Sequence, residues 1–512
     1  MKRQTHRLFA LLMTLVITSF VLPLSAITAI AANDSYQNAD ALALNTCISD
    51  SITSSSDKNW YVFTTTKAGY IRIDFDRPNQ DSTDSLWEMY LYECQSGTKT
   101  PDTSSSNTML HYYYKGNDES TKSCYIGLKP GTYYLQIIPY SYNYWSDATY
   151  KLTVNFTADE NWEQENNDAY SSYTNMPLNS PVYGSTKDSS DKDWYRFEVT
   201  EPGYISIDFD RPNQDSTDSL WEMLLCECQS GTKTPDTSSS NTMLHYYYKG
   251  NSESTKSCDI GLKPGTYYLQ IIPYSYNYWS DATYKLTVNF TADENWEQES
   301  NNDSKSYNNI PLNSPMYGST KNDSDSDWYR FEVTEEDTFT ISFDHKAWDN
   351  NNSFWRIDLY ECTEGTTTPK SSSLTYFYCK GSAEKFTSES IKLTPGKYFI
   401  KVSPYSSSSY ADWAYALTVK ADSYVPPEET ILYGDANCDD TVDISDAVLI
   451  MQNQANPEKY PISEKGLRNA DCVDNPKGVT PIDALAIQMI EAKSIAPDAL
   501  PTTAEYISSM QS

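Results

Sequence analysis

Residues 85–93 read SLWEMYLYE, in which apolar side chains alternate with polar or tyrosine side chains at a period of two. Residues 353–361, SFWRIDLYE, repeat the pattern. Successive side chains of a β-strand point to opposite faces, so Trp87, Met89 and Leu91 are expected to share one face of a sheet. The stretch therefore predicts a strand with one buried face, and its tryptophan is assigned to the core.

The same strand belongs to a module that occurs three times. Residues 69–165 and 203–299 align without a gap at an offset of 134, with five differences. A third, divergent copy follows, and the expected modules span residues 33–156, 157–290 and 291–421. The differences are Arg72/Ser206, Tyr90/Leu224, Tyr92/Cys226, Asp118/Ser252 and Tyr125/Asp259. The tryptophans assigned to the three cores are Trp87, Trp221 and Trp355.

Each module consists of short alternating segments separated by Gly, Pro, Asn, Asp and Ser, without a convincing helical run. This pattern is typical of a β-sandwich or barrel. The predicted fold class is therefore mainly β, with three tandem β-sandwich modules followed by a small α-helical, calcium-binding module. A module of about 130 residues is large enough to form its own core.

Four segments of the module resemble the bacterial pre-peptidase C-terminal domain. In the second copy they are residues 191–197, 203–207, 264–269 and 284–288. The resemblance implies a β-sandwich attached to secreted enzymes, and it identifies no ligand. The long insert, such as residues 227–256, departs from the usual shorter form, and the peptidase that usually accompanies the domain is missing from the sequence.

The ten cysteines lie after the amino-terminal segment, and the spacing CxxC never occurs. We expect disulfides to clamp the insert of each module. The expected pairs are Cys94–Cys124, Cys228–Cys258 and Cys362–Cys379, whereas Cys47, Cys226, Cys438 and Cys472 have no obvious partner.

Composition limits the classes of partner. The 512 residues include 38 Lys and Arg against 70 Asp and Glu, a formal net charge of −32. This acid excess argues against nucleic acid and against anionic membranes as partners. Residues 1–31 read as a signal peptide, with a basic start, an apolar run and a small-residue cleavage site, and no other stretch is long and apolar enough to span a membrane. The protein is therefore expected to be secreted and extracellular.

After residue 421 the composition changes, and residues 435–446 read DANCDDTVDISD. Calcium is bound by six to eight oxygens from a loop that wraps around it, and this spacing supplies them. The predicted ligands of this first loop are Asp435, Asn437, Asp439, the Thr441 carbonyl, Asp443 and Asp446.

A second loop follows at residues 471–483, with one additional residue and with Lys477 near an expected ligand. Its predicted ligands are Asp471, Asp474, Thr480 and Asp483, with weaker calcium binding or a different set of oxygens. Two loop–helix repeats resemble a dockerin, which implies Ca²⁺ as cofactor and a cohesin module of a scaffold protein as partner. Asp440, where Gly is common, and the longer second loop resemble variant dockerins of anaerobic fibre- and starch-degrading gut bacteria. We assign residues 422–431 to a linker, 432–495 to the dockerin and 496–512 to a tail; the alternative is a solitary calcium-stabilised cap.

Aromatic loops suggest a ligand for the β-modules. Residues 140–147 read YSYNYWSD and recur as residues 274–281 between two predicted strands. Consecutive large aromatics in a loop cannot all face a core, and sugar rings pack on flat aromatic side chains. The predicted carbohydrate-binding residues are Tyr140, Tyr142, Tyr144, Trp145, Tyr274, Tyr276, Tyr278 and Trp279. The tyrosine triplets at 112–114 and 246–248 are a second candidate, although some of each must be core.

These features favour a non-catalytic protein that binds a polysaccharide, starch or plant fibre, and is held at the cell surface through a scaffold. No nucleophile elbow, HExxH motif or Cys/His pair is visible. The alternatives are a structural or adhesion stalk without glycan binding and a cryptic glycoside hydrolase. In the third copy the loop reads YSSSSYADWAY from residue 405, so Ser407 and Ser409 replace Tyr276 and Tyr278. This module is expected to bind the polymer weakly or not at all.

Overall fold

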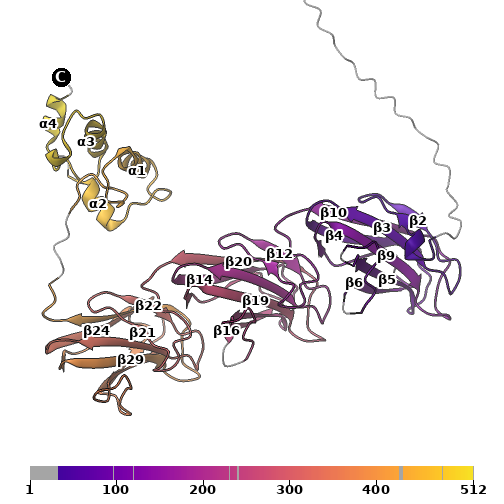
Figure 1. Cartoon of the computed structure of the whole chain (residues 1–512), viewed down its shortest axis with the longest axis horizontal. Helices are drawn as coiled ribbons and strands as arrows, with labels where there is room; N and C mark the ends of the chain where they lie inside the picture. The colour runs from indigo at the N-terminus through magenta and orange to yellow at the C-terminus, as the bar shows by residue number, and fades with distance from the viewer. Residues whose placement is uncertain are drawn as a thin grey trace, which may run out of the picture. The chain divides into compact units, whose positions relative to one another are not determined.

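The computed structural model describes residues 33–95, 97–105, 107–118, 120–229, 231–238, 242–425, 431–474 and 477–510. The predicted signal peptide and residues 426–430 of the predicted linker lie outside these ranges. The chain divides into two compact units, of which the first ends at Asp422 and the second begins at Ser423. The first unit consists of three β-sandwich modules and the second is helical, as the sequence predicts (Figure 1).

The first module has two five-stranded sheets. One has the strand order β1-β3-β9-β5-β6, and in the other β2-β10-β4-β7 is joined by β8, which pairs with β4. The elements are η1 (Tyr36–Asn38), β1 (Asp40–Ala41), β2 (Ile48–Asp50), β3 (Asn59–Thr65), β4 (Gly69–Asp76), β5 (Ser85–Glu93), β6 (Thr108–Lys115), β7 (Ser120–Lys122), β8 (Ile126–Leu128), β9 (Gly131–Pro139) and β10 (Tyr150–Ala158).

The second and third modules repeat this topology. The strands of the second are β11 (Thr174–Asn175), β12 (Val182–Ser185), β13 (Asp193–Val199), β14 (Gly203–Asp210), β15 (Ser219–Glu227), β16 (Thr242–Lys249), β17 (Ser254–Lys256), β18 (Ile260–Leu262), β19 (Gly265–Pro273) and β20 (Thr283–Ala292). Those of the third are β21 (Asn308–Asn309), β22 (Met316–Ser319), β23 (Asp327–Val333), β24 (Asp337–His345), β25 (Ser353–Glu361), β26 (Thr375–Lys380), β27 (Lys385–Thr387), β28 (Ile391–Leu393), β29 (Gly396–Pro404) and β30 (Ala414–Ala421).

The core of each module lies between its two sheets. Trp87, Met89 and Leu91 on β5 are fully buried, which confirms the inward face predicted for this strand. Trp221 and Trp355 are equally inaccessible, so the assignment of the three tryptophans to the cores is confirmed. Full burial of such side chains contributes about 1.5–3 kcal/mol each, which makes the alternating pattern a strong determinant of register.

A pair of tyrosine hydroxyls joins the two sheets inside every module. The hydroxyls of Tyr61 and Tyr150 are 2.7 Å apart in the first module. The same distance separates Tyr195 from Tyr284 in the second module and Tyr329 from Tyr415 in the third. Buried hydroxyls need hydrogen-bond partners, so each pair requires further polar groups around it.

The described residues of the second unit form four short α-helices and a 3-10 turn. Asp443 caps α1 and Thr480 caps α3, each in a capping box with the Asp three residues further on. No helix among the described residues is long and apolar enough to cross a bilayer. The elements are α1 (Ile444–Ala455), α2 (Glu464–Ala470), α3 (Pro481–Glu491), η2 (Pro497–Ala499) and α4 (Ala504–Ser509).

The predicted disulfides are wrong, because all ten cysteines are free thiols. Cys94 follows β5 in one sheet, whereas Cys124 lies between β7 and β8 of the opposite sheet. Cys228 and Cys258 are separated in the same way. In the third module, Cys379 on β26 pairs with Trp355 near the start of β25, and Cys362 follows the end of that strand.

Candidate functional site

The first predicted calcium loop curls around the carboxylate of Asp435, which is fully buried. Asp435 Oδ1 accepts a hydrogen bond from the Asp439 amide at 3.1 Å, and its Oδ2 accepts one from the Asp440 amide at 3.3 Å. Cys438 and Asp440 adopt φ values of 61° and 65°, the left-handed region in which the chain turns tightly. Asp440 thus adopts the conformation for which Gly is common at that loop position.

Asp446, on the first turn of α1, closes this loop. Its Oδ1 accepts the Asn437 amide at 3.0 Å and its Oδ2 accepts the Asp443 amide at 2.9 Å. Burial raises the pKa of the Asp446 carboxyl, and the charges of Asp435 and Asp439 add to the increase. Converging carboxylates that repel one another, together with an all-oxygen donor set, fit a hard divalent cation such as Ca²⁺.

The second loop joins two of its four predicted ligands, Thr480 and Asp483, by hydrogen bonds. Asp483 is fully buried, and its Oδ2 accepts both the amide and the hydroxyl of Thr480, at 2.7 and 2.8 Å. Asp471 Oδ1 accepts the Gly478 amide at 3.1 Å. Asp474 is exposed and its amide donates to the Thr502 carbonyl, so its backbone belongs to the contact with the tail. The donor set of this loop is smaller than that of the first.

The aromatic loops between β9 and β10 and between β19 and β20 reach solvent. Tyr142 is 79% exposed and Tyr276 is 80% exposed, the highest values among the large aromatics of the described residues. Tyr140, Tyr144, Tyr274 and Tyr278 are also exposed. Trp145 is half-buried and packs against the core of the first module, and Trp279 is half-buried as well. The tyrosines of these loops are therefore better placed to meet a ligand than the tryptophans.

The triplet at 112–114 alternates as expected for a strand. Tyr114 is buried, Tyr112 packs partly against the core, and Tyr113 is 52% exposed. The ring of Tyr113 meets the ring of Tyr140 edge to face, with centroids 5.5 Å apart. One tyrosine of the triplet thus extends the exposed aromatic surface of the loop onto the sheet.

In the third module the loop keeps its backbone but loses two of its four rings. Ser406 and Ser409 form the same isolated bridge as Ser275 and Tyr278. Tyr405 and Tyr410 remain exposed, and Trp413 packs on Trp348 with centroids 5.1 Å apart. The loop conformation therefore does not depend on the tyrosines that Ser407 and Ser409 replace.

The structure also shows buried acidic clusters that the sequence analysis missed. At the start of the second module, Glu163, Glu165 and Asp193 come within 4.8 Å of one another, as do Glu165, Asp168 and Asp191. Lys187 lies among them. Its Nζ is 3.0 Å from Glu165 Oε2, 2.5 Å from Asp191 Oδ1 and 3.4 Å from Asp168 Oδ2.

The electrostatics of this cluster are unusual because Glu163, Glu165 and Asp191 are buried. Burial raises the pKa of Glu163 and that of Glu165 to about 7 each, although hydrogen bonds to Glu163 and the charge of Lys187 near Glu165 oppose the shift. Burial alone lowers the pKa of Lys187, but Glu165, Asp191 and Asp168 outweigh it and hold that pKa well above its ordinary value. The ammonium group is therefore the cation that compensates these carboxylates.

The cluster also completes the tyrosine pair of the core. Glu163 Oε2 accepts the hydroxyl of Tyr195 at 2.6 Å, and Asp193 accepts the hydroxyl of Tyr284 at 2.7 Å. In the third module, Glu297 and Asp327 accept those of Tyr329 and Tyr415. Comparison of the module copies at an offset of 134 could have revealed this acidic cluster. Its lysine and two glutamates recur in the third copy as Lys321, Glu297 and Glu299. The first copy has Thr53, Ala29 and Ala31 at these positions.

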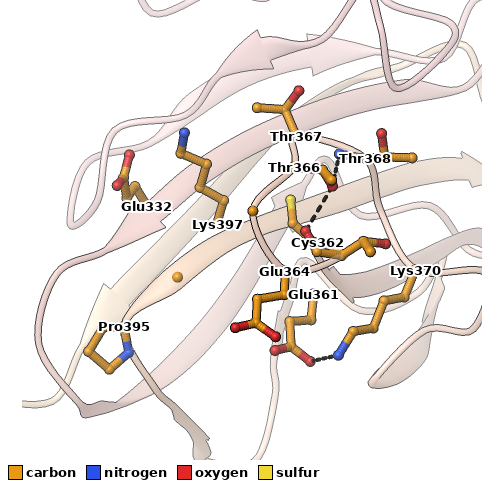
Figure 2. Close-up of a pocket in the computed structure, with 13 residues that line it drawn as sticks. Glu332, Glu361, Cys362, Glu364, Thr366, Thr367, Thr368, Lys370, Pro395 and Lys397 are labelled. Carbon is orange, nitrogen blue, oxygen red and sulfur yellow. Dashed lines mark hydrogen bonds and ion pairs between the residues drawn. The ribbon is translucent and has the colours of Figure 1, made fainter.

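A large pocket in the third module has a different character. It has a volume of about 890 Å³, and Figure 2 shows Glu361 paired with Lys370 in it, with Glu332 and Lys397 on the opposite side. None of its 13 lining residues is aromatic. The pocket therefore offers charged groups and hydroxyls but no flat apolar face for a sugar ring.

No family model matches the chain. A stretch of 126 residues is 32% identical to a xylanase/beta-glucanase of Ruminococcus flavefaciens, covering 19% of this chain and 16% of that enzyme. The chain spans 16 to 22% of the length of the curated relatives that it matches.

Two solved structures are similar to separate parts of the chain. One is the third ScaB cohesin of R. flavefaciens in complex with a group 1 dockerin, at 44% identity over 13% of this chain and 95% of that one, with a TM-score of 0.13. The other is the pre-peptidase C-terminal domain of a collagenase from Bacillus anthracis, at 22% identity over 23% of this chain and 93% of that one, with a TM-score of 0.17.

Proposed function

We propose that this chain is a secreted, non-catalytic polysaccharide-binding protein that a calcium-dependent dockerin–cohesin contact attaches to a scaffold at the cell surface. Its β-modules would hold the polymer, and its helical unit would hold the cohesin. The observation that carries the proposal is the pair of aromatic loops, whose most exposed rings are Tyr142 and Tyr276.

The helical unit supports the attachment. Two acidic loops each lead into a helix whose first turn carries a fully buried aspartate, Asp446 on α1 and Asp483 on α3. Calcium bound in the loops would fix the start of both helices. The exposed side chains of α1, Ile444, Val448 and Met451, give it an apolar surface. Such a surface, shaped by the ions, suits a protein partner.

The aromatic loops support the proposal that the β-modules bind a polymer. Six tyrosines with exposed rings occupy the two copies of one loop, three in each, beside amide and carboxylate side chains such as Asn143 and Asp147. Two similar sites on one chain increase the effective affinity for a repetitive polymer. Starch is the first polymer to test, and the similarity to a xylanase/beta-glucanase adds plant fibre.

Affinity electrophoresis of the protein in gels with soluble starch, xylan, mixed-linkage β-glucan or hydroxyethylcellulose tests the proposal. Retardation by one polymer supports binding. Release of reducing sugar would instead support a glycoside hydrolase. If the protein is not retarded in any gel and releases no reducing sugar, the results favour a stalk that only extends the dockerin.

The double variant Tyr142→Ser with Tyr276→Ser is expected to lose most of this retardation. Loss of a stacked aromatic costs on the order of 2 kcal/mol per site, or about 30-fold in affinity. Serine is the residue at this loop position in the third module, as Ser407, so the loop tolerates the change. Dissociation constants from the gels measure the effect.

Single variants separate avidity from loss of a site. Either change alone should weaken retention less than the double change, because one loop remains. Tyr170→Ser is a matched control, since Tyr170 is also exposed but lies outside the loops. Retention of the double variant equal to that of the parent would show that the loops do not bind the polymer.

A further inference from the structure

The outer face of one sheet in the first module contains a groove distinct from the aromatic loop. The groove has a volume of about 530 Å³ and lies over β5, β6 and β9. Lys58, Thr103 and Ser105 of the first module and Asp188 of the second module also line it. Tyr90 and Tyr92 of β5, Gln136 of β9 and His111 of β6 line it. These side chains are on the face of the sheet that points away from the core.

The strand register places these groups in one row. Tyr90 is directly opposite Gln136 of β9 on one side and His111 of β6 on the other. The rings of Tyr90 and His111 stack with centroids 4.2 Å apart, and Tyr92 is parallel to Tyr90 at 5.7 Å. The three stacked rings form one wall of the groove.

The Glu88 carboxylate fixes two of these rings. Glu88 Oε1 accepts the Tyr90 hydroxyl at 2.5 Å and lies 2.6 Å from His111 Nε2. Trp60 stacks on Tyr92 from the other side, with centroids 5.8 Å apart. The wall of the groove is therefore held in place before any ligand arrives, which lowers the entropy cost of binding.

Two polar groups in the groove have no protein partner. Gln136 is 7% exposed and Tyr92 is 6% exposed, yet neither the amide nor the hydroxyl forms a hydrogen bond within the described part of the chain. Both polar ends remain accessible to solvent, so water satisfies them in the free protein and a ligand can take the place of that water. Both line the groove, where a ligand can reach them.

The chemistry of the lining indicates the class of ligand. Hydroxyls and an amide predominate, and the two oppositely charged side chains that reach the groove, Lys58 and Asp188, balance each other. A protein with a net charge of −32 thus presents a nearly neutral groove here. Hydroxyl and amide donors and acceptors beside aromatic rings match a neutral, polyhydroxylated chain, and the length of the row matches an extended one.

The second module is a natural comparison. It keeps the counterparts of Glu88, His111 and Gln136 as Glu222, His245 and Gln270, but Tyr90 and Tyr92 become Leu224 and Cys226. Two of the five differences between the copies thus fall on adjacent outward positions of one strand. Cys226 is buried and Leu224 cannot form a hydrogen bond, so the two tyrosine rings of the wall are absent there.

We propose that this groove is a second polysaccharide-binding site, specific to the first module, in which Tyr90, Tyr92 and Gln136 hold a neutral sugar chain. The proposal rests on the proposed function, because it assigns an additional site for the same class of polymer. Tyr113, which contacts both His111 and Tyr140, connects the groove with the aromatic loop along one surface.

Reciprocal exchange between the modules tests the site in the full-length protein. The variant Tyr90→Leu with Tyr92→Cys gives the first module the residues of the second, and Leu224→Tyr with Cys226→Tyr does the reverse. In gels with soluble starch, xylan or mixed-linkage β-glucan, the first variant should bind about 10-fold more weakly and the second more tightly than the parent. Gln136→Leu removes the unpartnered amide and should weaken binding without lowering the melting temperature.

The outcomes separate this site from the function as a whole. If the parent binds a polymer and both the exchange variant and Gln136→Leu bind it equally well, the groove is not a site, while the proposed function stands. If the parent binds none of the polymers, both proposals fail. If the variant Tyr90→Leu with Tyr92→Cys unfolds, the binding of Gln136→Leu alone decides whether the groove is a site.

Discussion

Replacing Lys187 with alanine is expected to destabilise the second module by about 3–5 kcal/mol, because it leaves buried carboxylates without their cation. Glu165 and Asp191 are completely buried, and Lys187 pairs with both. Because both carboxylates are buried, a lysine or arginine on the protein surface cannot take the place of Lys187. Calorimetry of the full-length protein in chelator, so that no divalent ion takes the place of the ammonium, measures the shift of the transition.

The stability that Lys187→Ala loses should depend on pH. The folded-state pKa of Glu163 and Glu165 is about 7, above the ordinary 4.5, so the folded protein holds more protons than the unfolded chain between these values. Stability therefore falls as pH rises through this window and levels off above it. Without Lys187 the pKa of Glu165 rises further, so the variant should lose more stability than the parent between about pH 5 and pH 8.

Matched lysines provide the controls. Lys192→Ala removes an exposed cation from the same loop and should change stability little. Lys321→Ala should behave like Lys187→Ala, since Lys321 pairs with buried Glu299 and Asp325 at 2.5 and 2.9 Å. An unchanged melting temperature for both Lys187→Ala and Lys321→Ala would show that these carboxylates are not held by lysine.

The first module explains why the lysine and the acids belong together. Thr53 stands where the other copies have lysine, and it donates its amide and hydroxyl to Asp57 at 2.6 and 2.7 Å. Asn59 replaces Asp193 beside the tyrosine pair and donates to Tyr150 at 2.8 Å. Where the sequence lacks the two glutamates, it also lacks the compensating lysine.

Alternation along the strands was sufficient to predict the β-class and the core tryptophans. Residues 85–93 form β5 with Trp87 inward, because a one-residue shift would expose its entire apolar set. Disulfide pairing could not be predicted in this way. Sequence spacing places Cys94 and Cys124 at the two ends of one insert, but it does not show that the ends belong to opposite sheets.

The calcium, glycan and acidic sites could be predicted only in part from the sequence. The calcium loops are local, so their ligands could be numbered from spacing. Which aromatics of 140–147 face solvent depends on the loop backbone, and this packs Trp145 against the core while exposing Tyr142. The acidic clusters and the groove draw residues from several distant strands, and only the comparison of the module copies carries a signal for them.

Removing calcium is expected to unfold the helical unit and to abolish cohesin binding. Each loop holds aspartates that repel one another when no cation is present, and a small unit gains much of its stability from bound metal. All α-helices of the described residues lie in this unit. The helical circular dichroism signal of the full-length protein should therefore decrease in chelator, while the β-modules keep theirs.

Asp439→Ala distinguishes a metal effect from a structural one. In chelator the helical unit of the variant and that of the parent should both be unfolded, so the two proteins should give the same circular dichroism signal. With calcium present, the variant should bind the ion at least about 10-fold more weakly and melt at a lower temperature, as seen by titration calorimetry and thermal melting.

The control for this variant is Glu458→Ala, which removes an exposed acid outside both loops. The first loop has the larger set of acidic ligands, so Asp439→Ala should reduce stability more than Asp474→Ala in the second. Equal melting of the parent with calcium and with chelator would mean that these loops are not calcium sites, and the cohesin contact would then need another basis.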